Sequence, residues 1–136
     1  MGKLVGLIFN RLIMKYQKEE KKAFSANLEK RTKDFAVTII KTLRYLKQGD
    51  EGRIIKNQIF RSSTSVGANY REANRARSKA DFRSKVRICE AEASETIYWL
   101  EIIDDLDWLT DEKLKELQSE AKELLAIFST ISKNTK

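Results

Sequence analysis

The sequence of 136 residues has no proline, no histidine, one cysteine and only five glycines. Proline and glycine are the residues that most often interrupt helices, so their scarcity indicates long helices joined by short connections. Charged residues make up 35% of the chain and hydrophobic residues 41%, which is too apolar for a disordered protein. The length suits one domain with a substantial core. The composition therefore predicts a single all-α domain.

The absence of histidine excludes catalytic triads with an imidazole base and the carboxylate–histidine type of di-iron site. The lone Cys89 excludes an internal disulfide and suits the reducing environment of the cytoplasm. We therefore expect a cytoplasmic protein with no bound cofactor and no catalytic site.

The first part of the chain differs from the rest: residues 1–24 form an N-terminal extension, and residues 25–136 form the predicted domain. The apolar run in residues 4–14 is interrupted by Asn10 and Arg11, and it is shorter than the ~20 apolar residues that a membrane span requires. We expect no integral membrane association. The extension is interpreted as disordered or as a short amphipathic helix for a membrane surface or a partner, and disorder is the simpler interpretation.

Apolar residues recur every three or four positions in four segments, which is the period of a helix. We predict helices over about residues 25–47 and 53–74, a third after Ser78 and a fourth after Thr110. Because short connections make consecutive helices antiparallel, the predicted architecture is an up-down-up-down four-helix bundle. The stripes that define the helices include Leu28, Phe35, Ile39 and Leu43; Ile59, Val66 and Tyr70; Val86, Cys89, Ala93 and Leu100; and Leu114, Leu117, Leu124 and Phe128.

Two of the predicted helix starts carry capping signals. Ser78 and Asp81 stand three residues apart and resemble a capping box at the start of the third helix. Thr110 is followed by Asp111 and Glu112, so we expect its hydroxyl to cap the fourth helix.

The stretch RSSTSVGANYREANRARSKADF, residues 61–82, concentrates small polar residues before a run of arginines. It fits neither a phosphate-binding P-loop nor a nucleophile elbow, and both of those sites need a preceding strand. A nucleophilic serine here would need a base other than histidine, and nothing in the pattern places Lys56 for that role. Ser63 and Gly67 lie four residues apart, so we interpret the stretch as a helix face that another helix approaches closely.

A polar stripe on the second predicted helix is expected to face carboxylates on the third. Reflection of the second helix about the turn near residue 78 places Arg61 opposite Glu95, and Ser65 near Glu90 and Glu92. We predict a partly buried structural polar network rather than a carboxylate metal site, because an arginine lies opposite the acids and no histidine is present. Its members are Arg61, Ser65, Asn69, Glu92 and Glu95.

The segment TIYWLEII, residues 96–103, is apolar on most sides of its helix. Tyr98, Trp99 and Ile102 lie off the stripe that faces the core, so a small bundle cannot bury all of them. We predict that these three residues form an interface between subunits, although the extension or the fourth helix is an alternative cover.

Charge is divided unevenly along the chain. Residues 1–88 hold 22 of the 27 Lys and Arg, whereas residues 89–136 hold 12 of the 20 Asp and Glu. The richest segment is a basic cluster around the turn between the second and third helices, which we predict to contact phosphates. Salt bridges within the fold or between subunits are the alternative. The cluster consists of Arg71, Arg75, Arg77, Lys79, Arg83, Lys85 and Arg87.

Two quoted segments carry a family resemblance. The segment NQIFRSSTSVGANYREANRARSKADF, followed by EAEASETIYWLEII, resembles the small bacterial four-helix-bundle proteins encoded in 23S rRNA intervening sequences. The patterns Arg-Ser-x-x-Ser-Val-x-Ala-Asn and Glu-x-x-Glu-Thr-x-Tyr-Trp-Leu are rather specific together. The resemblance runs from about Leu28 to Ile131, and the long start of this chain departs from the family's usual short one.

The resemblance implies a homopentameric barrel of four-helix protomers. The family is similar in fold to the accessory variability protein of diversity-generating retroelements, which binds nucleic acid and a reverse transcriptase. We therefore expect a non-enzymatic oligomer that binds nucleic acid, RNA rather than DNA, through phosphate contacts. The alternative is a scaffold that docks a partner protein such as a reverse transcriptase.

Overall fold

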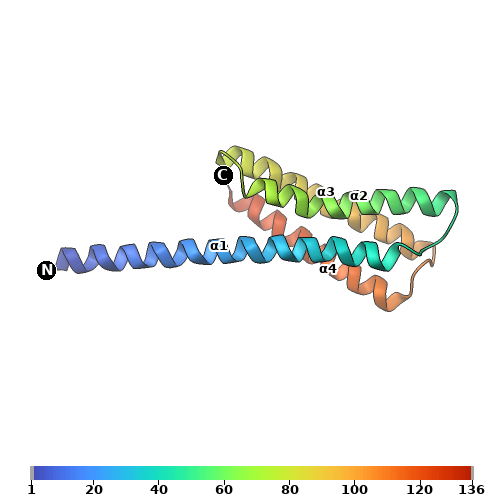
Figure 1. Ribbon diagram of the computed structural model, residues 1–136, viewed down its shortest axis with the longest axis horizontal. Coiled ribbons are helices and arrows are strands. Elements are labelled where there is room, and N and C mark those ends of the chain that lie inside the picture. The colour runs from blue at the N-terminus through green and yellow to red at the C-terminus, as the bar shows by residue number, and fades with distance from the viewer. Residues whose placement is uncertain (1, 136) are drawn as a thin grey trace.

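The computed structural model describes residues 2–135, and within that range it contains four helices and no strand. The helices are α1 (Gly2–Leu43), α2 (Asp50–Ala73), α3 (Lys79–Asp105) and α4 (Asp111–Asn134). Consecutive helices run antiparallel, and the turn between α2 and α3 lies at the end of the bundle where the chain's C-terminus also lies (Figure 1). This arrangement confirms the predicted all-α four-helix bundle.

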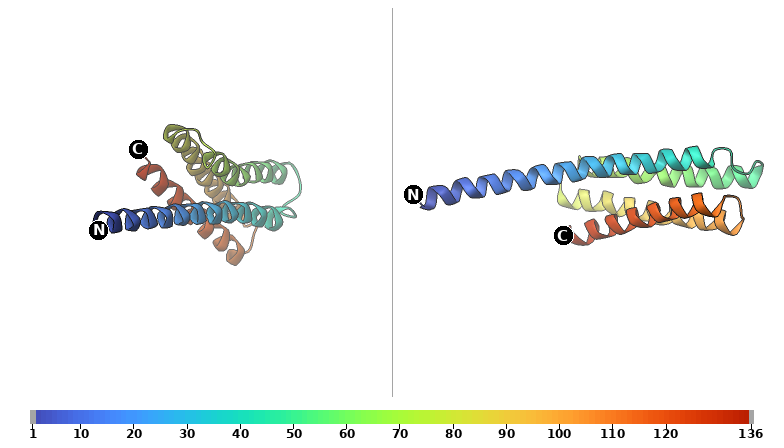
Figure 2. Two further views of the ribbon diagram at one scale, coloured as in Figure 1. Left: turned by 60° about the vertical axis from the view of Figure 1, so that its left-hand side comes forward. Right: turned by 90° about the horizontal axis from the view of Figure 1, so that it is seen from below.

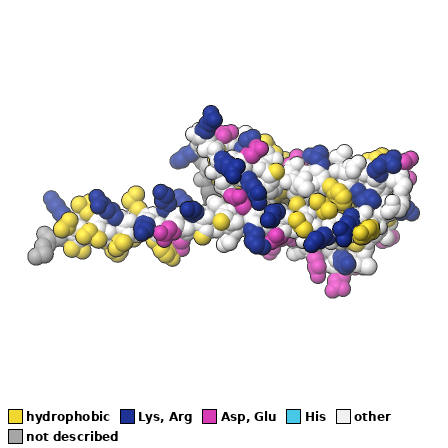
Figure 3. Space-filling view, viewed as in Figure 1, with side chains coloured by type: hydrophobic (Ala, Val, Ile, Leu, Met, Phe, Trp, Pro, Cys, Tyr) yellow, Lys and Arg dark blue, Asp and Glu magenta, His cyan; other side chains and the backbone are white. Residues whose placement is uncertain are grey.

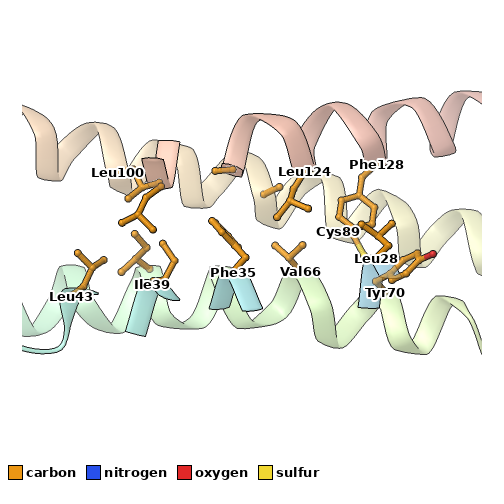
Figure 4. Close-up of a cluster of buried hydrophobic side chains, with 14 of the residues drawn as sticks. Leu28, Phe35, Ile39, Leu43, Val66, Tyr70, Cys89, Leu100, Leu124 and Phe128 are labelled. Carbon is orange, nitrogen blue, oxygen red and sulfur yellow. The ribbon is translucent and has the colours of Figure 1, made fainter. Parts of the chain in front are cut away.

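The core is a column of apolar side chains from all four helices (Figure 4). Ile39 of α1, Val66 of α2, Leu100 of α3 and Leu124 of α4 are fully buried. Tyr70 and Phe128 pack ring against ring near the α2–α3 turn, with centroids 5.5 Å apart. The apolar stripes predicted from the sequence are therefore the faces that the helices turn toward one another.

The connection from α1 to α2 lies earlier in the chain than the sequence indicated. Helix α1 ends at Leu43 rather than near residue 47, and α2 begins at Asp50 rather than near residue 53. Gly49 has a φ of 104°, a backbone conformation that favours glycine. A Cβ atom on Gly52 would lie 1.9 Å from the carbonyl oxygen of Lys47. The two glycines therefore allow the chain to fold back directly onto the first turn of α2.

The small residues of α2 allow neighbouring helices to approach, as the sequence predicted. A Cβ atom on Gly67 would lie 2.9 Å from the Thr32 hydroxyl oxygen of α1. On the other side, Thr96 of α3 donates a hydrogen bond of 2.9 Å to the buried Ser62 hydroxyl. The close approach of Thr32 therefore explains why a glycine, despite its low helix propensity, stands at position 67.

The two predicted capping signals have different outcomes. The Ser78 hydroxyl accepts a 3.0 Å hydrogen bond from the backbone N–H of Asp81, so the predicted cap of α3 is confirmed. Thr110 does precede α4, but its side chain makes no capping hydrogen bond. The expectation of a hydroxyl cap there is wrong, and the acidic residues Asp111 and Glu112 alone complement the helix dipole.

Residues 2–24 continue α1 outward without a break (Figure 2). Helix α1 projects well beyond the other three, at the same end of the bundle as the α2–α3 turn. Within residues 2–135, no helix combines the length and the apolar character needed to cross a membrane.

Candidate functional site

The seven residues of the basic cluster lie on the last turns of α2, the α2–α3 turn and the first turns of α3. Lysine and arginine side chains gather at this end of the bundle in the space-filling view (Figure 3). The antiparallel turn brings the two helix ends together. The N-terminal turn of α3, which starts at Lys79, adds the positive end of a helix dipole to this surface.

Two members of the cluster are held by carboxylates of the same chain. The Arg71 Nε lies 3.6 Å from a carboxylate oxygen of Glu29 on α1. Lys85 donates a 3.0 Å hydrogen bond to Glu72 across the α2–α3 pair, and this bond raises the pKa of Lys85. Asn74 also donates to Glu29, at 3.0 Å. These contacts tie the end of α2 to both neighbouring helices, so Arg71 and Lys85 have a structural role.

Four members are exposed and form no ion pair with any residue in 2–135, namely Arg75, Arg77, Lys79 and Arg87. Arg83 differs from them, because it is half-buried. Its Nε is enclosed without a hydrogen-bond acceptor among the described residues. A buried guanidinium N–H without an acceptor is uncommon in folded proteins, and an anion reaches this one only when the Arg83 side chain moves.

Arg83 and Arg87 line a shallow groove along the outer face of α3. The other lining residues are Ala80, Ser84, Ile88, Ala91 and Glu92. Small side chains at positions 80, 84 and 91 leave the two arginines accessible from solvent. The groove therefore offers guanidinium and hydroxyl donors over a partly apolar floor, which suits a phosphate or carboxylate ligand.

The structure brings together three members of the predicted polar network. Arg61 of α2 donates to Glu92, with an N–O distance of 3.1 Å, and to Glu95 on α3. The hydrogen bond from Arg61 lowers the pKa of Glu95, and the Trp99 indole N–H, 3.3 Å from the same carboxylate, lowers it further. The network therefore fixes the register of α2 against α3.

The other two predicted network members bond within their own helix. Ser65 donates to the carbonyl of Arg61, and Asn69 donates to the carbonyl of Ser65. Neither reaches the carboxylates of α3. Within residues 2–135 no three His, Cys, Asp or Glu side chains converge as a metal site would require.

The serines of α2 are engaged in packing. Ser62 and Ser63 are buried, and each donates to a carbonyl of its own helix. Lys56 lies near Leu46, where its amine is 3.4 Å from the carbonyl oxygen. The Lys56 amine of α2 therefore lies against the α1–α2 connection, and both serine hydroxyls have structural partners.

The predicted interface residues lie on the outer part of α3. Tyr98 is 55% exposed and packs edge-on against Trp99, whose centroid is 5.1 Å away. Trp99 and Ile102 are half-buried. Ile88 of α3 and Leu106, which directly follows α3, are also exposed, and the sequence analysis missed them. Neither shares the face of Tyr98, because ten residues before it and eight residues after it are each about 80° away around a helix.

The fold and this arrangement of residues can be compared with known proteins. A model of the 23S rRNA-intervening sequence protein family matches residues 25–130. A crystal structure of a protein of unknown function from the S23 ribosomal protein family of Bacteroides thetaiotaomicron is 35% identical, with a TM-score of 0.72. The similarity covers 78% of this chain and 98% of that one. A comparison with curated proteins finds no match.

Both matches cover most of the four-helix bundle, and the family model includes the polar network and the whole basic cluster. The sequence patterns in α2 and α3 had already indicated the same family. The chain therefore belongs to the 23S rRNA-intervening sequence protein family.

Proposed function

We propose that this protein is a non-enzymatic, oligomeric, cytoplasmic protein that binds RNA through its phosphates. The observation that carries the proposal is the set of exposed cations at the α2–α3 end that form no ion pair in residues 2–135, namely Arg75, Arg77, Lys79 and Arg87. Unpaired surface cations in one patch attract a polyanion and release its counterions. The family's name, which refers to an intervening sequence of 23S rRNA, supports RNA as the polyanion.

Arg83 and Arg87 extend the proposed surface along α3. Both line the α3 groove and supply guanidinium donors for one phosphate group, while the exposed side chains around the turn contact adjacent phosphates. The aromatic residues nearest the cluster, Tyr70 and Phe82, are buried and half-buried and cannot act as open stacking platforms. Binding is therefore electrostatic, with little readout of base sequence.

Oligomerisation is supported by Tyr98, an exposed aromatic side chain of α3 that packs against the half-buried Trp99. The pentamer implied by the family resemblance would repeat the basic cluster in a ring. Weak phosphate contacts at each protomer then add up through avidity. Tyr98, Trp99 and Ile102 are the residues proposed for the contact between protomers.

Binding can be measured by fluorescence anisotropy with a labelled structured RNA and with a DNA hairpin of the same sequence. The test variant carries Arg77→Glu, Lys79→Glu and Arg83→Glu. We expect the variant to bind RNA at least about tenfold more weakly than the wild type, since several phosphate contacts are removed, and a DNA hairpin bound as tightly would show that the phosphates alone are recognised. Equal binding of wild type and variant would contradict the proposal.

The second candidate function is a scaffold for another protein, and the exposed Tyr98 beside Trp99 on α3 favours it. A scaffold would show no RNA binding near physiological salt, in either wild type or variant. It would instead retain a partner protein through Tyr98 and its neighbours. The same anisotropy experiment therefore separates the two functions.

A further inference from the structure

The part of α1 that projects from the bundle has two distinct sides. Val5, Ile8, Phe9, Leu12, Ile13 and Tyr16 follow one another at spacings of three and one, which places them on one half of the helix. Their exposed fractions lie between 39% and 64%. The other half carries the basic residues Arg11, Lys15, Lys18 and Lys22 together with the exposed apolar residues Leu4, Leu7 and Met14.

This apolar half is not a continuation of the face that α1 buries in the bundle. The buried stripe includes Leu28, Phe35 and Ile39, and its upstream continuation runs through Ser25, Lys21 and Lys18 to Met14 and Leu7, none of which belongs to the apolar half. At 3.6 residues per turn, the apolar half is centred on the order of 150° around the helix from the buried stripe. The bundle therefore lies on the other side of α1 and leaves the apolar half accessible.

Charge decides between the possible occupants of the apolar half. Residues 2–18 contain four Lys and Arg and no Asp or Glu. A second copy of the same segment would cover the apolar half but would leave the basic residues of both copies without a complementary charge. Nucleic acid would match the charge but would leave the six apolar side chains in water. A surface with anionic headgroups above an apolar interior matches both halves.

We propose that residues 2–18 form an interfacial helix that docks the protein on membranes rich in anionic phospholipid. The apolar half enters the boundary between headgroups and acyl chains, where aromatic side chains such as Phe9 and Tyr16 are favoured. Arg11 and Lys15 remain at the headgroups and contact lipid phosphates. Hydrophobic and charged side chains lie interleaved along this segment in Figure 3. This inference is independent of RNA binding by the α2–α3 end.

The test is sedimentation of the full chain with vesicles of phosphatidylglycerol and phosphatidylcholine in equal parts, and with phosphatidylcholine alone. The variant Phe9→Ser with Leu12→Ser keeps every charge. The matched control is Tyr45→Ser with Ile54→Ser, which removes similarly exposed side chains from the bundle region. We expect wild type and control to bind the anionic vesicles and the Phe9/Leu12 variant to bind at least about tenfold more weakly.

Equal binding of the Phe9/Leu12 variant and the wild type to anionic vesicles would overturn the proposal. So would equal binding of the wild type to both kinds of vesicle, because charge would then have no part. Sedimentation velocity without lipid tests the remaining alternative, which is contact between two copies of the chain. If the wild type ignores both vesicles and the Phe9/Leu12 variant has a lower molecular mass, the apolar half is an interface between protein chains and the proposal fails.

Discussion

Cys89 is fully buried in the bundle core, and burial raises the pKa of its thiol to about 12. Only the thiolate reacts with disulfides and alkylating reagents, so the folded protein holds this cysteine in an inert form. The sequence showed that Cys89 lies on the core stripe of α3. It could not show the depth of burial, which depends on how the other three helices close around it.

Cys89 should therefore react with an aromatic disulfide reagent only after unfolding, at a rate that follows the opening of the bundle. The raised pKa also sets a pH dependence. A free thiol titrates near pH ~8.5, so the contribution of Cys89 to stability is complete below that pH and declines as the pH rises toward its folded pKa. The decline should be smaller in Cys89→Ala when the free energy of unfolding is measured from pH 8 to 11. Rapid labelling of the native protein at pH 8 would contradict this account.

Arg61 lies between two carboxylates of α3, and its hydrogen bond lowers the pKa of Glu95. Because the pKa of Glu95 is lowered in the folded state, its ion pair with Arg61 stabilises the fold above the ordinary titration range of Glu. This contribution disappears as the pH falls through the folded pKa of Glu95. The side chain of Arg61 is nearly half exposed, so solvent weakens the effect.

Arg61→Gln should lower the free energy of unfolding at pH 7 by about 1 kcal/mol or less. The difference from wild type should shrink as the pH is lowered below 4, because the carboxylates are then protonated in both proteins. Arg53→Gln, which breaks an exposed pair with Asp50 inside α2, is the matched control and should change stability less. A difference for Arg61→Gln that does not depend on pH would show that the ion pairs are not the cause.

At the scale of the element, the sequence predicted the four stripes but not all the helix ends. The stripes follow from the period of apolar residues, which burial in a bundle requires. The ends of α1 and α2 depend on how the chain crosses between them, and that crossing is set by contacts such as Lys47 against Gly52. The sequence did indicate locally that α1 extends upstream of residue 25, because residues 7–48 contain neither proline nor glycine.

Gly52→Ala should destabilise the protein by about 1–3 kcal/mol, because the new methyl group would meet the Lys47 carbonyl oxygen at 1.9 Å. Gly6→Ala is the matched control, since a Cβ atom there meets nothing within 4 Å and alanine favours the helix. Thermal unfolding of the two variants measures the difference. If Gly52→Ala is as stable as wild type, the connection is looser than the structure indicates.

At the scale of the whole molecule, the sequence predicted only some of the contacts between helices. Reflection about the α2–α3 turn placed Arg61 opposite Glu95, and the structure brings them together. The same reasoning could not foresee that Arg71 meets Glu29, because α1 reaches that end of the bundle from a distant part of the sequence. The projecting helix and the basic cluster lie at one end of the molecule, so both proposed ligands approach from that side.

The most direct test of the central claim is the salt dependence of RNA binding for two variants of equal net charge. One variant carries Arg77→Gln and Lys79→Gln in the basic cluster, and the other carries Lys115→Gln and Lys122→Gln in α4. We predict that the cluster variant reduces the slope of log affinity against log salt by roughly 0.7–0.9 for each phosphate that its side chains no longer neutralise. The α4 variant should keep the wild-type slope. Equal slopes for the two variants would contradict the account, because the cations at the α2–α3 end would then bind no phosphates.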